Sequence, residues 1–490
     1  MARLLPHTKH LMSLRLSKKS FFLYFKYWIT FAVFLSCAFA AGAQTVFPTD
    51  TLARWLSGYI TKKSESGQEK AAGIHFADLC RKQGLHVRVF TDIDSSYNFA
   101  ASVFPLSSNK PNILFLSHID VVPANDTADW EFPPYAGIIK DSLVWGRGSL
   151  DAKGLAIMQL GALLRFIQKN KNSLESLPYN ITILAVSGEE TGGFNGAKII
   201  VNQFLKELNP VVLFGEGGSG IDKVVPSKPE KQVFGISVAE KNNLWLKLEL
   251  KFLTFGHGAA PPNSYANKAM VKALTKLNNI DTRIDFNKTN KRMFRELGKL
   301  EGGFKGFIIR HIHWRIFRPV LNKIIDDEPL FKSILSNTTA LTNMYNPPGP
   351  PNQISNKATA YLDCRLLPGT NRKKFIRDIK YGLIEPRFKV SVINECPEAE
   401  ESSPETPFYK ALDQAIQTIY PQAAVMPILF PASSDNNYFR EKGVLVYGIT
   451  PVFMSRHNLE SIHSSNEHIS LAQLSEGVAV YEHFLDKIMK

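Results

Sequence analysis

The sequence has few cysteines, and no apolar run after residue 45 is long enough to span a bilayer. Only four cysteines occur among 490 residues, and Cys80, Cys364 and Cys396 are widely separated. This spacing excludes a disulfide framework and a CxxC metal site. We expect each of the three to be buried in apolar surroundings, with one disulfide as the alternative.

The sequence also lacks a dense stripe of basic residues. Its net charge is +14, but residues 1–43 hold six basic residues and no acidic residue, so the rest of the chain has a net charge of +8. Such a weak surplus predicts a mildly basic soluble enzyme and no nucleic acid partner. With 44% hydrophobic and 21% charged residues, the chain is also not disordered.

The N-terminus is typical of a secretory signal. A basic stretch ends at Lys26, an apolar run covers 27–41, and Ala41-Gly42-Ala43 forms a small-x-small cleavage site. We therefore expect a signal peptide at 1–43 and a secreted or periplasmic protein. The alternative is an uncleaved signal anchor that holds the protein at a membrane.

The remaining chain is too long for one core, so at least two domains are expected. Apolar strands at 112–122, 181–186 and 211–214 alternate with helices at 151–170 and 198–208. This pattern is typical of an α/β fold with a mixed, mostly parallel sheet flanked by helices. Alternating, half-exposed strands at 243–255, 358–365 and 388–393 indicate a different, inserted α+β domain. We place a catalytic domain at 44–234 and 401–490, with the insertion at 235–400.

Ligands of a doubly wound sheet bind at the carboxyl ends of its strands, and several candidate ligands follow the predicted strands. Each has a simpler interpretation when it is taken alone; Asp151, for example, can be a helix cap. Together they match what two divalent ions require, namely a bridging carboxylate plus one carboxylate and one imidazole for each ion. Asp151 is suited to bridge, His118 with Glu216 would complete one half-site, and His463 with Glu190 would complete the other.

Two acidic residues are then left without a metal. Glu189 would be a free carboxylate beside the metals, which is the position of a general base. Asp120 follows His118 by two residues and can accept the second ring proton, which fixes the tautomer. The His and carboxylate set favours two zinc ions, with manganese or cobalt as alternatives.

These motifs resemble the dinuclear zinc metallopeptidases of clan MH, which include carboxypeptidase S, aminoacylase, succinyl-diaminopimelate desuccinylase and peptidase T. The matching strings are SHIDVVP at 117–123, GRGSLDAKG at 146–154, SGEETGG at 187–193, and Ile462-His463 with Asn466-Glu467. The resemblance implies the same five metal ligands, with Glu189 as the base that activates water.

The resemblance also implies that the inserted segment is a ferredoxin-like lid, which supports a homodimer in this family. In the lid, Gly256-His257-Gly258 resembles the motif whose histidine reaches a substrate carbonyl, often across a dimer. Asn352 and Arg365 match substrate-binding positions, and an Arg can form a bidentate pair with a terminal carboxylate. Taken alone, His257 after a strand would be a surface turn residue, and from spacing alone Arg365 is equally an ion-pair partner of Asp363.

The lid looks oversized, with a basic and aromatic stretch at 284–335 that resembles the carboxypeptidase S branch and its N-fatty-acyl-amino-acid hydrolases. We favour a solvated basic face here over contact with a membrane or an acyl chain. The predicted function is hydrolysis of peptide or N-acyl-amino-acid amide bonds next to a free carboxylate. A deacylase, deacetylase or desuccinylase of the same fold is one alternative, and a non-catalytic binding protein is another.

Overall fold

The computed structural model describes residues 48–489 apart from 254–255, 279–282 and 328. The predicted signal peptide lies outside the described residues. In the part of the chain that is described, no helix is both long enough and apolar enough to cross a membrane. Cys80, Cys364 and Cys396 are free and buried. Cys396 departs from the expected apolar setting, because its sulfur lies 3.1 Å from the backbone nitrogen of Asn243.

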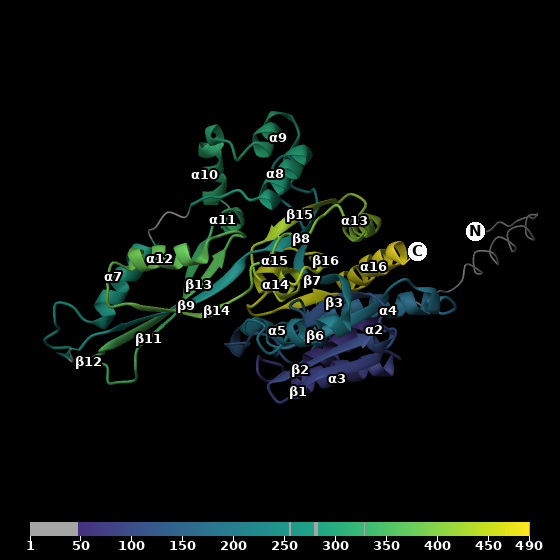
Figure 1. Ribbon diagram of the computed structural model, residues 1–490, viewed down its shortest axis with the longest axis horizontal. Helices are drawn as coiled ribbons and strands as arrows, with labels where there is room; N and C mark the ends of the chain where they lie inside the picture. Colours follow the sequence, from purple (N-terminus) through teal and green to yellow (C-terminus); the bar gives the residue numbers. More distant parts are fainter. Residues whose placement is uncertain (1–47, 254–255, 279–282, 328, 490) are drawn as a thin grey trace, which may run out of the picture. The chain divides into compact units, whose positions relative to one another are not determined.

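An eight-stranded mixed sheet is the centre of the larger part of the fold (Figure 1). Its inner strands β6, β3, β7 and β16 run parallel, as does β15 beside β8, whereas β1 and β2 are antiparallel. This confirms the predicted α/β sheet and adds a hairpin at one edge. In order of pairing the strands are β1 (His86–Ile93), β2 (Ser96–Ser102), β6 (Asn180–Val186), β3 (Asn112–His118), β7 (Pro210–Ile221), β16 (Leu445–Phe453), β8 (Val233–Glu240) and β15 (Ala424–Phe430).

Helices bury both faces of this sheet. On β3, Leu114 and Leu116 pack in a cluster with α5 (Ala197–Gln203) and α14 (Asn436–Glu441). Phe115 points the other way, and its ring centroid lies 5.0 Å from that of Tyr481 on α16. The same face is covered by α2 (Thr49–Ile60), α3 (Lys70–Lys82), α4 (Lys153–Lys169), α13 (Pro407–Ile419) and α16 (Leu471–Ile488). Burial on both faces explains the continuous apolar runs of the inner strands.

A separate four-stranded antiparallel sheet corresponds to the predicted lid. Its elements follow the chain as β9 (Asn242–Lys251), α7 (Ala266–Asn278), β11 (Thr338–Tyr345), β13 (Lys357–Leu366), α12 (Arg372–Leu383) and β14 (Lys389–Glu395). The strands pair in the order β11-β13-β9-β14, which is the ferredoxin-like arrangement. Alternate residues of β9 and β13 are buried under α7 and α12, so the alternating pattern seen in the sequence marks a one-sided core.

Four further helices interrupt the lid between α7 and β11. They are α8 (Lys288–Glu301), α9 (Gly303–Arg310), α10 (Arg318–Asp327) and α11 (Pro329–Leu335). Their apolar residues do not extend the lid core. They join a cluster with Val233, Ala239, Met426 and Leu429, which belong to edge strands β8 and β15 of the large sheet. This insertion therefore packs against the larger part of the fold, although it lies within the lid in sequence.

The two sheets are joined by a single residue, Lys241, between β8 and β9. The lid boundary that we predicted at 235 thus falls inside a strand of the large sheet. Lys241 is fully buried, and its ammonium donates to the carbonyls of Ser333 and Ser336 at 2.8 and 2.9 Å and to the Thr338 hydroxyl at 2.9 Å. The side chain thereby fixes the end of α11 and the start of β11 to the junction.

Burial, followed by the positive charge of Arg365, lowers the pKa of Lys241 to about 7. Between pH 7 and 9 the unfolded chain, with an ordinary lysine pKa of about 10.4, binds a proton that the folded chain does not. We therefore expect the unfolding free energy of the wild type to rise with pH relative to Lys241→Met, by at most about 1.4 kcal/mol per pH unit. Urea unfolding of both proteins at pH 7 and pH 9 measures this. Lys410→Met, on the exposed side of α13, is the control. An equal difference in unfolding free energy between the wild type and Lys241→Met at both pH values would contradict the expectation.

Candidate metal centre

The predicted ligands lie at the carboxyl edge of the large sheet, each positioned by a different element. His118 ends β3, and Glu189 and Glu190 lie in a short 3-10 helix just after β6. Glu216 lies within β7, where the pairing to β16 jumps from Gly215 to Gly218. This bulge takes Glu216 out of the regular ladder and lets its side chain turn toward the neighbouring strand end.

The other two ligands come from turns that a small sheet brings together. Asp151 lies in the turn between β5 (Leu143–Trp145) and α4, and His463 lies between α15 (Arg456–Ser461) and β17 (His468–Ser470). Because β17 pairs with β5, with His468 opposite Trp145, the C-terminal turn is held beside the turn that carries Asp151.

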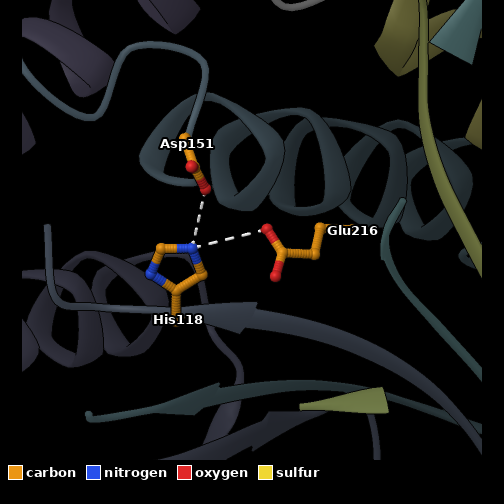
Figure 2. A group of neighbouring side chains, drawn as sticks. All are labelled: His118, Asp151 and Glu216. Atoms are coloured by element: carbon orange, nitrogen blue, oxygen red, sulfur yellow. Dashed lines mark hydrogen bonds and ion pairs between the residues drawn. The ribbon is translucent and has the colours of Figure 1, made fainter. Parts of the chain in front are cut away.

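The first half-site contains His118, Asp151 and Glu216 (Figure 2). The Nε2 atom of His118 lies 2.9 Å from Oδ1 of Asp151 and 3.5 Å from Oε2 of Glu216. The imidazole is almost fully buried, while both carboxylates are partly accessible. One nitrogen and two oxygens thus converge with the spacing that a divalent cation needs.

The second half-site contains Asp151, Glu190 and His463. The Nε2 atom of His463 lies 3.0 Å from Oδ2 of Asp151 and 3.3 Å from Oε1 of Glu190. The two oxygens of Asp151 therefore face two different histidines, as a bridging carboxylate requires. The His463 side chain is about half exposed, at 51%, so the centre opens to solvent on this side.

The charges at this centre call for cations. Contacts with Asp151 and Glu190 raise the pKa of His463 to about 10. Burial lowers the pKa of His118, but Asp120, Asp151 and Glu216 outweigh burial and hold it well above its usual value. Burial raises the pKa of Glu216 to about 7. The negative field that keeps both imidazoles protonated also suits divalent ions, so the donor set fits a metal pair.

Glu189 is placed beside this centre by its backbone. Gly188 has a left-handed φ of 74°, which a glycine adopts without strain, and this turn directs the next two amides at Asp120. The amides of Glu189 and Glu190 each donate to the Asp120 carboxylate at 3.1 Å. Burial, followed by the negative charge of Glu216, raises the pKa of the Glu189 carboxyl well above its usual value.

Asp120 contacts the His118 ring in a different way from the simple pair that we expected. The Nδ1 atom of His118 lies 2.9 Å from the backbone carbonyl of Asp120, and the carboxylate lies 3.6 Å away. That carboxylate also accepts a hydrogen bond from the Ser66 hydroxyl at 2.8 Å. Asp120 therefore contacts both His118 and the turn that carries Glu189.

Glu467 has a structural role that the sequence analysis did not assign. It is fully buried, and its Oε2 accepts from Arg147 Nη1 and the Gly148 amide at 2.8 and 3.0 Å. Its Oε1 accepts from the amides of Leu150 and Asp151 at 2.8 and 3.1 Å. One carboxylate thus holds the whole turn that presents Asp151. The Asn466-Glu467 pair was recognisable in the sequence. Its partner, the turn that carries Asp151, is identified only by the β17–β5 pairing.

Two more carboxylates from outside the ligand set approach the centre. Asp435 is buried, and burial, followed by the charge of Asp120, raises its pKa well above its usual value. Glu240, at the end of β8, pairs with Arg440 at 3.0 Å and accepts from Asn436 at 2.7 Å. Asn436 also donates to the backbone carbonyl of Glu216 at 2.8 Å, which links the junction between the sheets to the metal centre.

The three predicted substrate-binding residues separate into two groups. His257 and Asn352 lie together, with 3.1 Å between His257 Nε2 and Asn352 Nδ2, and both are exposed. Arg365 forms the ion pair with Asp363 that was the alternative interpretation, at 3.0 Å. It lies opposite Asn243 at the start of β9, near the junction, whereas His257 follows the far end of the ten-residue β9. A strand of that length spans about 30 Å, so the two groups are well separated.

Comparisons with known proteins agree with this geometry. The sequence pattern of peptidase family M20/M25/M40 matches residues 114–487. The probable carboxypeptidase S-like 2 of Dictyostelium discoideum is 24% identical over 410 residues, which cover 83% of this chain and 77% of the relative. The human N-fatty-acyl-amino acid synthase/hydrolase PM20D1 is 27% identical over 383 residues, covering 75% and 73%.

Solved structures share the fold. An M20 family metallo-carboxypeptidase, Sso-CP2 of Sulfolobus solfataricus, superposes with a TM-score of 0.66 at 18% identity, over 88% of this chain and 98% of that one. Human carnosine dipeptidase 1 superposes with a TM-score of 0.67 at 16% identity, over 90% and 96%. At these identities the likeness concerns the architecture alone.

The Glu467 network predicts a matched pair of variants. Each carboxylate oxygen of Glu467 accepts two N–H groups. Glu467→Gln replaces one of these oxygens by an amide nitrogen, which cannot accept. Two buried N–H donors therefore lose their acceptor in either orientation of the amide. We expect a loss of about 2–5 kcal/mol in unfolding free energy and about 10–100-fold weaker zinc binding. Glu460→Gln, in an exposed pair with Arg456, should change neither. Urea unfolding and competition with a zinc chelator measure both, and wild-type zinc affinity in Glu467→Gln would contradict the assigned role.

Proposed function

The chain belongs to peptidase family M20/M25/M40, and from this premise we propose that it hydrolyses amide bonds next to a free carboxylate. The observation that carries the proposal is the partly buried Glu189 carboxyl beside two half-sites that share Asp151. A binding protein would have no need of a free carboxyl at this position, so the non-catalytic alternative is disfavoured. The proposed substrates are dipeptides, short peptides cleaved at the C-terminus, and N-acyl amino acids.

We assign the metal ligands from the donor set. His118, Asp151 and Glu216 would hold one ion, and Asp151, Glu190 and His463 would hold the other. Imidazole and carboxylate donors favour zinc, with manganese and cobalt as alternatives. When bound, the two ions supply Lewis acidity that polarises the scissile carbonyl and lowers the pKa of water.

Glu189 is the general base in this proposal. Its carboxylate removes a proton from the attacking water and then delivers that proton to the leaving amine. A base of this kind works best when its pKa approaches the working pH, and burial beside Glu216 shifts Glu189 in that direction. Asp120 is a positioning residue, because it holds the Glu189 turn and contacts His118.

The lid residues contribute substrate binding. Arg365 is the candidate for the substrate carboxylate, since it lies at the junction end of β13 and only one side of its guanidinium faces Asp363. His257 and Asn352 are candidates for the carbonyl oxygen of the scissile bond. Because β9 places them about 30 Å from the junction, we propose that they serve the metal centre of a second copy in a homodimer.

The names of the relatives do not identify the acyl group of the substrate. One is named as a carboxypeptidase and another as an N-fatty-acyl-amino acid synthase/hydrolase, so peptidase and acylase activities are both consistent with the family. Deacetylation or desuccinylation of amino acids is a further alternative within the same fold. We keep the proposal that residues 1–43 direct secretion, with a membrane anchor as the alternative.

The base assignment is tested with Glu189→Gln and a panel of dipeptides, N-acyl amino acids and their carboxamide counterparts. The variant should keep its bound zinc and lose about 10²–10⁴-fold in kcat, because only the proton acceptor is removed. The wild type should be inhibited by chelator, restored by zinc and inactive on the carboxamides. Wild-type turnover in the variant would refute the base, and no turnover by the metal-loaded wild type on any substrate would refute the hydrolase proposal.

The shared-site proposal is tested by mixing two inactive variants. Glu189→Gln lacks the base and His257→Ala lacks the lid imidazole, but a dimer of one of each contains one complete site. After dissociation and reassociation of equal amounts, we expect about a quarter of wild-type activity, from random pairing of two-fold dimers. Activity no higher than the average of the separate variants would contradict a site shared between copies. Bound zinc in each variant serves as the control for an intact metal centre.

A further inference from the structure

The helical insertion contains a cavity that is remote in sequence from the metal ligands. Its volume is about 610 Å³, within the range of small-molecule sites. Its walls come from the segment before α8, from α8, α10 and α11, and from the turn after α9. Among the lining residues that the structure describes, five are basic (Arg283, Lys291, His313, Arg318 and Lys332) and one, Asp285, is acidic.

The floor of the cavity is apolar. Ile312, Leu321 and Ile325 are buried members of the core that the insertion shares with β8 and β15. Phe286 lies at one side, with its ring centroid 6.1 Å from that of His313. A cationic rim above an apolar floor is complementary to a molecule with one anionic group and a hydrocarbon part.

The positive charge is concentrated in this part of the chain. Residues 283–332, which include every described residue of the cavity wall, hold twelve basic residues and six acidic ones, a surplus of six within the net charge of +8 of residues 44–490. Of the acidic residues, Glu296 pairs with Lys299 and Glu301 accepts from the Ser227 amide. Among the side chains that are described, none of the four Lys and Arg residues lining the cavity forms an ion pair. Burial and the charge of Lys291 lower the pKa of His313, which reports the same positive field.

An exposed aromatic cluster adjoins the cavity. It consists of Phe307, His311, Trp314 and Phe317, whose ring centroids lie 4.3–6.4 Å from their neighbours. Trp314 is also 6.3 Å from His313 of the cavity wall, so the two features are continuous. Ile316 beside the cluster is 77% exposed. Exposed Trp, Phe and Ile next to Lys and Arg are typical of surfaces that contact lipid.

We propose that this cavity binds the anionic head group of an amphiphile and that the aromatic cluster contacts its hydrocarbon chain. The head group is a phosphate or a carboxylate, which Arg318 and Lys332 contact from the rim. A purely polar anion would leave Trp314 and Ile316 unexplained, and a neutral apolar ligand would leave the basic rim unexplained. The sequence alone favoured a solvated basic face in this stretch. The cavity and the adjoining aromatic cluster favour a ligand site instead.

The test compares the full chain with two double variants. Arg318→Glu with Lys332→Glu reverses the charge of the rim, and Trp314→Ser with Ile316→Ser removes the apolar contact. Matched controls on the lid are Lys373→Glu with Lys374→Glu, and Tyr381→Ser with Ile384→Ser, which alter residues that are also exposed. Any lipid affinity of residues 1–43 is common to all five proteins.

Two probes distinguish the source of the amphiphile. One is vesicles of phosphatidylcholine with and without phosphatidylglycerol, and the other is decyl phosphate below its micelle concentration. We expect at least about tenfold weaker binding for the charge-reversal variant, from about 1 kcal/mol for each base near an anionic lipid. A similar loss is expected for the apolar variant, because burying a large apolar side chain contributes about 1.5–3 kcal/mol. The controls should bind as the wild type does. Binding to vesicles would identify a bilayer, and binding to decyl phosphate alone would identify a free amphiphile.

The salt dependence of binding and the activity and stability of the variants complete the test. The wild-type affinity should fall as salt is raised from 0.05 to about 0.5 M, since the rim charges are exposed. Hydrolysis of a water-soluble substrate should be unchanged in both variants, because neither touches the metal centre, and urea unfolding measures the packing that is lost when Trp314 leaves its ring contacts. No binding to either probe, or equal losses in the variants and their controls, would overturn the proposal without affecting the hydrolase assignment.

Discussion

The Asp151 carboxylate is contacted from both sides, by His118 at the end of β3 through one oxygen and by His463 near the C-terminus through the other. This contact requires two distant parts of the chain to meet within hydrogen-bonding distance. The β17–β5 pairing brings the backbones together, and the buried Glu467 fixes the turn that carries Asp151. The proposed metal assignment and the proposed role of Glu189 both depend on this one arrangement.

The lid depends on the same edge of the sheet through the β8–β9 junction. Glu240 ends β8 and is linked through Asn436 to the backbone of Glu216, and Lys241 then begins the passage to the lid. The junction end of the lid is therefore linked by hydrogen bonds to the candidate metal centre, and Arg365 lies at that end. The far end, with His257 and Asn352, is connected to it only through the length of β9. A rigid strand cannot bring both ends to one centre, which is why a second copy enters the proposal.

Much of the fold and the metal centre could be predicted from the sequence because both follow local rules. Apolar runs identified the parallel strands, alternation identified the lid sheet, and the residues after strand ends identified His118, Glu189 and Glu190. Features that depend on long-range packing could not be predicted in this way. Glu467 gains its role only from a partner turn far along the chain, and β8 has no pattern that assigns it to one sheet. The helices at 288–335 have amphipathic faces, but nothing local indicates that those faces pack on β8 and β15.

The distribution of charge explains how an acidic centre and a basic insertion coexist in one chain. Strong bases near the metal ligands would neutralise the carboxylates and compete with divalent ions. The two arginines buried closest to the ligand-bearing turns are instead held by carboxylates outside the ligand set, Arg147 by Glu467 and Arg440 by Glu240. The ligand carboxylates are therefore compensated by imidazoles alone among the described side chains that contact them, and imidazoles become neutral metal donors once a cation takes over their charge. The surplus of Lys and Arg is displaced to the insertion, where it faces solvent and is free to meet anions of another kind.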